Sequence, residues 1–449
     1  MRTSTVSVGL RQWCRSWYRY FCCLFIVLGA TEGAALAEAP PSRPAASSYR
    51  FVQLATDPWA RAYINASGQV AFEVNRNGNP SVRFFDGRRI RDFGTLGGTR
   101  ATVAGLNDRG QIAFNVVRDG HPRAMFYDGR RVRDLGTLGG PDATVGALNE
   151  LGQVAGSSSI RAGANLVHPY RWSESSGMVD LGAFGQGDAV VTAMNDRGQV
   201  TGHASFPLGA ISERRGFFWS PRTGIVDIGV IEEFSAPQAM NDAGTVVGTA
   251  GAGPQGILGF RWTRATGIGD MGTLPDEFTN VYDINNAGQV VGESPFVAGG
   301  NTHPFLWTPG QRLLDLGTGT ADSGAATEIN EHGIVIGGVV TRFITRGHGF
   351  IWTRETGLIE IGAGSPGLAT SALDVNERGQ VVGSLGTRAF VWTRGQGFID
   401  LNTLVSGRPR GLVFDTAFAI SEGGSILARA SSGLYLFMPG EGLDSPDVR

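Results

Sequence analysis

The sequence has no lysine, only three cysteines and, after residue 37, no apolar run long enough to cross a bilayer. All 38 basic residues are arginines. The cysteines, Cys14, Cys22 and Cys23, all lie within the first 37 residues. A chain processed after this segment has no cysteine, which excludes disulfides, thiolate catalysis and cysteine-based metal sites. Packing and hydrogen bonds alone must then hold it together.

Residues 1–37 have the composition of a secretory signal peptide. Four arginines precede the apolar stretch 21–30, and Ala35-Leu36-Ala37 is a small-residue cleavage site. Because the apolar stretch is short for a membrane span, we expect cleavage after Ala37 rather than an uncleaved anchor. The mature protein would be secreted, extracellular or periplasmic, without a transmembrane segment. Its formal net charge is about −5, and no basic patch is dense enough to predict nucleic-acid binding.

A motif of the form apolar-Asn-x-x-Gly-x-apolar recurs along the chain at intervals of 42 to 46 residues. Its asparagines are Asn65, Asn107, Asn149, Asn195, Asn241, Asn285, Asn330 and Asn376, and a degenerate ninth copy has Ser421. Periods of this size are typical of propeller blades or of paired-helix arrays. Glycine and β-branched residues recur in every unit, and no apolar stripe of period 3.6 is sustained, which favours strands.

Each unit contains four short strand signals. In one unit they are 279–284, 288–293, 303–307 and 312–317. The turn between the first two begins at Asn285, and we assign the same structural role to Asn107, Asn195 and Asn376.

The third strand is apolar at consecutive positions, as in Phe305-Leu306-Trp307. A strand that is apolar on both sides must be covered on both sides, as it is between stacked blades. The ninth unit lacks a fourth strand, and residues 51–54 can supply it from the other end of the chain. An N-terminal strand that completes the last blade closes a ring and removes its exposed edges.

We therefore predict one closed all-β propeller at residues 49–437, with about nine four-stranded blades. Eight blades and a degenerate extra segment are the alternative, because the ninth copy is weak. Residues 38–48 read as a flexible lead-in and 438–449 as a C-terminal tail. We expect a monomer.

The motifs resemble those of the HAF family of probable bacterial extracellular repeat proteins. The resemblance rests on Gly-Thr-Leu-Gly-Gly at 94–98 and 136–140, Asn-x-x-Gly-Gln-Val at 195–200, 285–290 and 376–381, and His-Pro-Phe-Leu-Trp at 303–307. It covers residues 51–437 and implies an exported bacterial protein, but no activity. The family's His-Ala-Phe tripeptide is eroded here. Histidine remains at His168, His303 and His348, and arginine stands in its place at Arg123, Arg215 and Arg388.

Several repeated residues admit a functional interpretation, and a structural one is preferred for each. Equivalent histidines on different blades lie too far apart to share a metal ion. The turns at 283–288 and 374–379 resemble calcium loops but lack the required ligands. The recurring Asp-Leu-Gly carboxylates are too regular for catalysis, and we expect them to accept backbone hydrogen bonds. We assign the repeated tryptophans to the core between blades rather than to a sugar-stacking platform: Trp172, Trp219, Trp262, Trp307, Trp352 and Trp392.

The segments that do not repeat are the better candidates for function. The connections between second and third strands, and between blades, vary in length and share one face of a propeller. The candidate ligand-binding residues on this rim are Arg161, Asn165, Phe206, Arg214, Phe296, Asn301, Arg342, Phe343 and Arg346.

The first functional hypothesis is a secreted binding scaffold whose rim recognises an envelope or extracellular glycan or protein. The alternative is a propeller glycoside hydrolase or lyase with a polar site in the central channel, for which Glu232-Glu233 and Asp276-Glu277 are the available carboxylates. A structural surface protein without a discrete site is the third. The sequence contains no cofactor-binding motif.

The assignment of the tryptophans to the core predicts the effect of truncating one of them. Trp307→Ala should lower the free energy of unfolding by roughly 3–5 kcal/mol, because a large buried side chain is replaced by a cavity. Thermal melting checks this, and an unchanged melting temperature would show that Trp307 is not a core residue.

Overall fold

The structure is a computed structural model. It describes residues 49–440 except 77, 163–165, 186–187, 209–210, 252–255, 273–277, 298–299, 342–346 and 363–367. The expected signal peptide and lead-in lie outside this range. Within it, the only helix is the short η2 (Leu401–Thr403), and no helix could cross a bilayer.

The strands form nine sheets of four, which we number as blades in chain order. Blade 1 contains β2 (Ala62–Ile64), β3 (Val70–Arg76), β4 (Asn79–Phe85) and β5 (Ile90–Gly94). Blade 2 contains β6 (Arg100–Leu106), β7 (Ile112–Arg118), β8 (His121–Tyr127) and β9 (Val132–Asp134). Blade 3 contains β10 (Ala143–Leu148), β11 (Val154–Ser159), β12 (Val167–Ser173) and β13 (Gly177–Asp180). Blade 4 contains β14 (Val190–Met194), β15 (Val200–Leu208), β16 (Ile211–Ser220) and β17 (Gly224–Gly229). Blade 5 contains β18 (Phe234–Met240), β19 (Val246–Gly251), β20 (Ile257–Thr263) and β21 (Gly267–Asp270). Blade 6 contains β22 (Asn280–Ile284), β23 (Val290–Pro295), β24 (Thr302–Trp307) and β25 (Leu314–Asp315). Blade 7 contains β26 (Ser323–Ile329), β27 (Val335–Val340), β28 (Gly347–Thr353) and β29 (Gly357–Glu360). Blade 8 contains β30 (Thr370–Val375), β31 (Val381–Leu385), β32 (Arg388–Thr393) and β33 (Gly397–Asp400). Blade 9 contains β34 (Phe414–Ile420), β35 (Ile426–Ala430) and β36 (Gly433–Pro439), together with β1 (Tyr49–Ala55).

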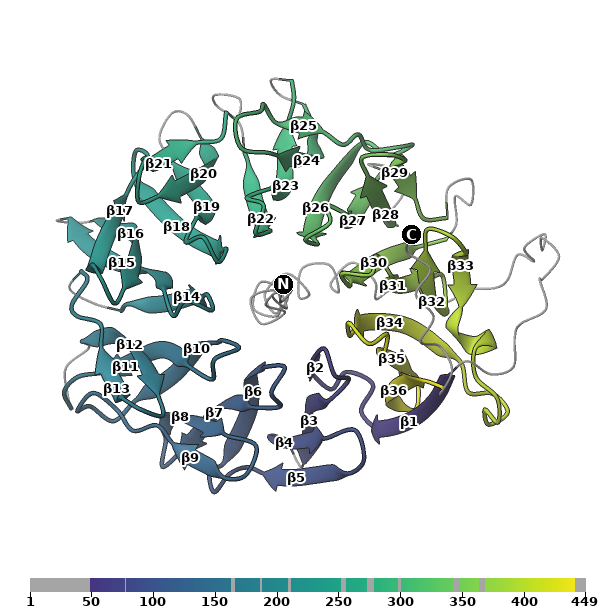
Figure 1. The fold of residues 1–449 in the computed structure, drawn as a ribbon, viewed down its shortest axis with the longest axis horizontal. Coiled ribbons are helices and arrows are strands. Elements are labelled where there is room, and N and C mark those ends of the chain that lie inside the picture. The colour runs from purple at the N-terminus through teal and green to yellow at the C-terminus, as the bar shows by residue number, and fades with distance from the viewer. Residues whose placement is uncertain are drawn as a thin grey trace, which may run out of the picture.

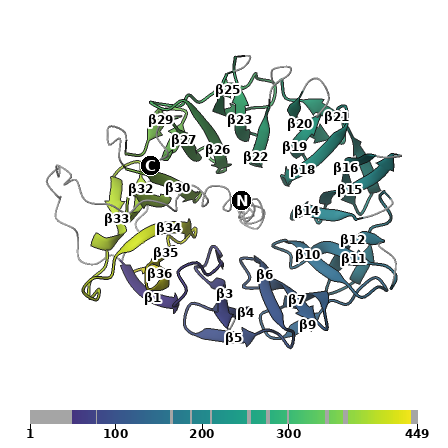
Figure 2. The same ribbon diagram turned by 180° about the vertical axis from the view of Figure 1, so that it is seen from behind.

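The nine blades form a closed ring, so the prediction of a nine-bladed all-β propeller is confirmed and the eight-bladed alternative is wrong. In every blade the first strand lies nearest the centre of the ring and the fourth lies at its periphery (Figures 1 and 2). The predicted closure is also confirmed. β1 pairs antiparallel with β36, with Phe51 opposite Phe437, and supplies the fourth strand of blade 9.

The third strands carry the core of each seam between blades. Phe305 and Trp307 pack with residues of blade 5, whereas Leu306 packs with residues of blade 7. Both sides of the strand are therefore covered, as its consecutive apolar residues require. The repeated tryptophans are buried, with exposed fractions of 4% to 9%.

A glycine in the second strand makes room for the third-strand aromatic ring. A Cβ at Gly292 would lie 2.0 Å from the carbonyl oxygen of Asn280 and 2.8 Å from the ring of Phe305. No larger residue fits between these groups, because real Cβ atoms essentially never come so close. Glycine occupies the same position in blades 3 to 8, where it is a packing requirement: Gly156, Gly202, Gly248, Gly292, Gly337 and Gly383.

The asparagines of the repeat join each blade to the next through buried hydrogen bonds. In each case the side-chain Nδ2 donates to the carbonyl oxygen at the same position of the following blade, over 3.0–3.1 Å. The Oδ1 atom of Asn285 also accepts the backbone N–H of Gln289, which closes its own turn. We call this set of bonds the asparagine girdle. Its eight donors, all at most 3% exposed, are Asn65, Asn107, Asn149, Asn195, Asn241, Asn285, Asn330 and Asn376.

A second series of bonds runs beside the girdle, one residue further along each turn. The backbone N–H of Asp108 donates to the Glu150 carboxylate, and the N–H of Glu150 donates to Asp196. Burial, and to a smaller extent the charge of the neighbouring Asp108, raises the pKa of Glu150 to about 7. The hydrogen bond that Glu150 accepts from the Asp108 N–H lowers this pKa, but by less. The acidic residues of these turns therefore repel one another while they join the blades.

The girdle is interrupted at one seam, between blades 9 and 1. Ser421 stands where the other blades have asparagine, and its hydroxyl accepts the N–H of Ser425 within its own turn. Across this seam the N–H of Gly423 donates to the carbonyl of Ala66 instead. Ala66 also has no carboxylate for the second series of bonds. We call this junction, where β1 closes the ring, the closing seam.

The girdle predicts a cost for removing one of its asparagines. Asn285→Ala should destabilise the protein by about 2–3 kcal/mol, because the Asn330 carbonyl and the Gln289 N–H lose their buried partners. Chemical denaturation measures this. Asn301→Ala, an exposed asparagine of the same blade, is the matched control and should stay within about 0.5 kcal/mol. Equal behaviour of the two variants would contradict a structural role for the girdle.

Glu150 predicts a pH dependence of stability. Its folded pKa of about 7 lies above the ordinary value of 4.5, so the folded protein binds more protons than the unfolded chain between these values. Stability therefore falls as the pH rises through this window. Glu150→Gln keeps an acceptor for Asp108 and should stabilise by about 1 kcal/mol near pH 8, after allowance for solvent screening, and by almost nothing near pH 4. Unfolding curves at the two pH values check this, and a gain independent of pH would contradict it.

Candidate functional site

The two faces of the ring are built differently. One carries the turns between first and second strands and between third and fourth strands, and we call it the floor. The opposite face carries the connections between second and third strands and those between blades, and we call it the loop face. Its connections range from the tight turn at 119–120 to the segment 401–413 between blades 8 and 9.

Exposed apolar side chains gather on the loop face. Among the described residues, twelve large apolar residues are exposed. Seven lie in connections or at strand ends of the loop face: Trp59, Leu166, Val190, Phe278, Val297, Val340 and Val413. Four lie on fourth strands at the periphery, and Ile90 and Leu314 among them stand at the floor end of their strands: Ile90, Val179, Leu314 and Phe398. Leu151 lies on the floor. A face that leaves apolar area in water is the face more suited to a ligand.

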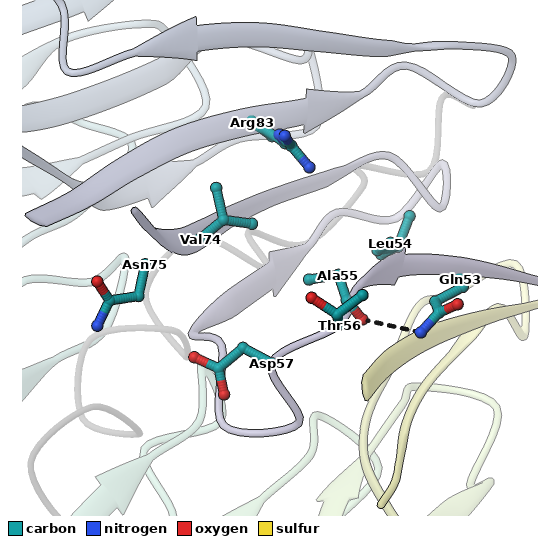
Figure 3. A pocket seen from close by; sticks show the side chains of 8 residues that line it. All are labelled: Gln53, Leu54, Ala55, Thr56, Asp57, Val74, Asn75 and Arg83. Atoms are coloured by element: carbon teal, nitrogen blue, oxygen red, sulfur yellow. Dashed lines mark hydrogen bonds between the residues drawn. The ribbon is translucent and has the colours of Figure 1, made fainter. Parts of the chain in front are cut away.

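A cavity of about 290 Å³ lies at the loop-face end of the closing seam. One side of its lining comes from the end of β1 and the segment after it, and the other from β3 and β4 of blade 1 (Figure 3). We call this cavity the seam pocket. The lining residues are Gln53, Leu54, Ala55, Thr56, Asp57, Val74, Asn75 and Arg83.

The polar groups of the seam pocket are held in place but keep unused hydrogen-bonding atoms. Arg83 Nε donates to Asp92 at 3.1 Å, and its two terminal nitrogens have no hydrogen-bond partner among the described residues. Asp57 Oδ1 accepts the N–H of Trp59, which leaves Oδ2 available. Thr56 and Asn75 are exposed, and their side chains make no hydrogen bond within the described part of the chain. The pocket thus presents donors and acceptors together.

Trp59 stands on the segment that forms one wall of the seam pocket, two residues after Asp57. It is 65% exposed, yet the guanidinium of Arg429 lies 5.3 Å from its ring centroid. The same guanidinium lies 4.1 Å from the ring of Phe418, a buried residue of blade 9. This stack of ring, cation and ring supports the exposed indole on one side.

The predicted rim residues that the structure describes belong to three different blades. Arg161, Arg214 and Asn301 are exposed, and they belong to blades 3, 4 and 6. Phe296 is partly buried and packs against the ring of His303. The remaining candidates, Asn165, Arg342, Phe343 and Arg346, lie outside the described residues.

Phe206 and Arg214 were expected in a connection of variable length between second and third strands, but the segment 203–214 that contains them is largely a hairpin. β15 and β16 extend the second and third strands, with Phe206 opposite Glu213. Phe206 is partly buried, because Phe184 packs against it at 5.0 Å and Arg215 covers its ring. A loop was expected because the other blades have a connection at this position of the repeat. In blade 4 the second and third strands continue to pair beyond it.

The histidines of the eroded tripeptide form hydrogen bonds with acids of their own blades. They contact the acid of the fourth strand over 2.5–2.9 Å, in the pairs His168–Asp180, His303–Asp315 and His348–Glu360. The arginines at the same position do likewise, in the pairs Arg123–Asp134, Arg215–Asp227 and Arg388–Asp400. Both residue types can donate to the acid, so either one satisfies this position.

In the five pairs with aspartate, the acid also closes the turn that follows it. Asp315 Oδ1 accepts the N–H of Gly317, and Asp180 and Asp227 make the equivalent bond. Burial raises the pKa of Glu360, but hydrogen bonds from His348 and Thr320 lower it more, so the pKa lies below its ordinary value. The Asp-Leu-Gly motif is thereby explained by blade architecture, as expected from its recurrence.

Of the carboxylates considered for catalysis, the structure describes Glu232-Glu233. Glu232 has a positive φ of 60° in the connection between blades 4 and 5, and Asp276-Glu277 lies outside the described residues. In the part of the chain that the structure describes, no group of three or more His, Cys, Asp or Glu residues is placed to hold a metal ion.

Sequence reasoning missed the seam pocket and Trp59. One signal was present: Trp59 is out of register with the third-strand tryptophans of the repeat, so the repeat cannot account for it. The pocket itself could not be found in this way, because its walls come together only through ring closure.

No family model matches this chain, and no curated protein matches it in sequence. Solved structures resemble it at low identity. Dipeptidyl peptidase 4 of Porphyromonas gingivalis aligns at 8% identity with a TM-score of 0.48, over 72% of this chain and 56% of that one. This chain therefore spans little more than half the length of the peptidase.

Two further solved structures are propellers by description. The β-propeller domain of the Trilobed protease from Pyrococcus furiosus aligns at 11% identity with a TM-score of 0.41, over 67% of this chain and 97% of that one. The Dos1 propeller aligns at 12% identity with a TM-score of 0.44, over 87% of this chain and 95% of that one. At such identities the likeness concerns the fold alone, and the sheet topology of this chain defines it as a nine-bladed β-propeller.

Proposed function

We propose that this protein is an exported bacterial binding scaffold, related to the HAF repeat proteins, which holds its ligand on the loop face. The observation that carries the proposal is the unequal distribution of exposed apolar side chains. Seven of the twelve lie in connections or at strand ends of the loop face, and three lie in a turn or at strand ends of the floor, within the described residues. Surface apolar area costs free energy in water, so its concentration on one face favours an interaction there.

The construction of the floor supports the same conclusion. Its turns repeat with little change because their asparagines and acids join neighbouring blades, so they have little freedom to vary toward a ligand. The connections of the loop face take no part in the girdle. Binding residues are found disproportionately on loops that a rigid frame positions.

The chemistry of the seam pocket favours binding over hydrolysis. Hydrolysis of a glycosidic bond generally uses two carboxyl groups on either side of the bond. The described lining of the pocket contains one carboxylate, Asp57, and the nearby Asp92 is paired with Arg83. A group of mixed donors and acceptors with one carboxylate can orient a ligand without cleaving it.

The proposal is tested by a binding screen of the purified protein against glycans and envelope fractions, with product analysis for every ligand found. A triple loop-face variant, Trp59→Ser, Phe278→Ser and Val297→Ser, should lose at least about tenfold in affinity, because a few exposed apolar and aromatic contacts often dominate binding.

The matched control changes three exposed apolar residues at the periphery, Ile90→Ser, Leu314→Ser and Phe398→Ser. It should bind within about twofold of the unaltered protein, since these residues lie outside the loop face. Equal losses in both variants would contradict the proposed binding face. Formation of a product would contradict a purely binding role.

A further inference from the structure

We infer that the seam pocket and Trp59 together form a subsite for one ring of a neutral glycan. The inference rests on the proposed function and narrows it, from a ligand somewhere on the loop face to a sugar at one seam. Four features carry it. They are the exposed indole packed against Arg429, the mixed polar lining, the size of the cavity, and the wall formed by the segment after β1, the strand that closes the ring.

The indole of Trp59 is a stacking surface prepared in advance. Of the seven tryptophans in the described residues, six are 4–9% exposed and Trp59 is 65% exposed. Arg429, itself held against Phe418, packs against one side of the ring. A flat apolar surface that is already ordered loses little entropy on binding, and the C–H groups of a pyranose ring can pack against it.

The polar lining of the pocket suits hydroxyl groups rather than an ion. Arg83 provides donors, Asp57 provides an acceptor, and Asn75 provides both. Arg83 is already paired with Asp92, so a phosphate would meet a cation whose charge is compensated. An ammonium group would meet only the single carboxylate of Asp57, with the Arg429 guanidinium behind the neighbouring indole. A sugar hydroxyl both donates and accepts, and it matches this lining.

The size of the cavity agrees with a small unit of a larger ligand. Its volume of about 290 Å³ is at the lower end of the roughly 300–1,000 Å³ that pockets for small molecules occupy. One sugar ring fits such a volume, and the rest of a chain would extend across the open loop face.

The walls of the seam pocket are not products of the repeat. The wall that carries Thr56 and Asp57 follows β1, which enters from the other end of the chain and completes blade 9. On the opposite wall, Asn75 lies near the end of the second strand of blade 1. The pairing of second with third strands places Val117 of blade 2 and Ser159 of blade 3 at the equivalent position. This combination of side chains therefore belongs to the closing seam.

The test is titration of the purified protein with a panel of soluble neutral oligosaccharides built from hexoses and N-acetylhexosamines. Binding is followed by calorimetry and by acrylamide quenching of tryptophan fluorescence. A sugar stacked on Trp59 should shield its indole, so quenching should decrease on binding. Trp59→Phe, which keeps a ring, reports how much of the change in quenching arises at this residue.

Two variants and one control locate the binding site. Trp59→Ala and Asn75→Ala should each weaken oligosaccharide binding at least about tenfold, as loss of an aromatic anchor or a central polar contact does. Phe398→Ala, an exposed aromatic residue on the fourth strand of blade 8, outside the loop face, should leave the affinity within about twofold. Melting temperatures of all three exclude misfolding as the cause.

The outcomes separate this inference from the proposed function. Loss in the two seam variants with retention in Phe398→Ala supports both. Binding that survives Trp59→Ala but not the triple loop-face variant leaves the binding face standing and refutes the seam subsite. A panel that does not bind refutes the glycan, and a protein ligand from the screen would then leave the binding face standing. Binding abolished only by changes outside the loop face refutes both.

Discussion

Eight buried asparagine side chains fix the spacing of the blades, and the rest of the molecule depends on them. Each one donates to the backbone of the next blade, and Asn285 shows how the same amide also closes its own turn, so that one side chain fixes two turns at once. A carboxylate could not do both, because the site requires a donor and an acceptor on one short side chain. This double use explains why asparagine recurs at this position while the connections on the opposite face differ from blade to blade.

This constraint divides the molecule into a uniform floor and a freer opposite face. Turns that bond to both neighbours have few alternatives, whereas connections on the loop face must only span the gap between strands. The interruption at Ser421 marks the closing seam, where the two ends of the propeller meet through β1 and β36. Because the walls of this seam come from unlike parts of the sequence, the repeat does not set the side chains that line its pocket.

The repeated part of the fold was predictable from sequence, and the non-repeated part was not. Period, turn chemistry and the consecutive apolar residues around Trp307 sufficed for blade number, closure and core. The partner of each repeated histidine was missed, because the acid stands twelve residues away, as between His303 and Asp315. Phe206 was expected on a loop and lies in a hairpin. Trp59 carried a signal, but its pocket depends on contacts between the first and last blades, which no local pattern specifies.

The central claim is that the repeated floor is scaffold and that the loop face at the closing seam holds the ligand. Hydrogen–deuterium exchange, measured with and without a ligand from the binding screen, tests this most directly because it reports on backbone amides along the whole chain. The account predicts slow exchange at the girdle turns in both states, and new protection confined to residues 56–61 and the end of β3. New protection in the floor turns, or along the innermost strands, would contradict it.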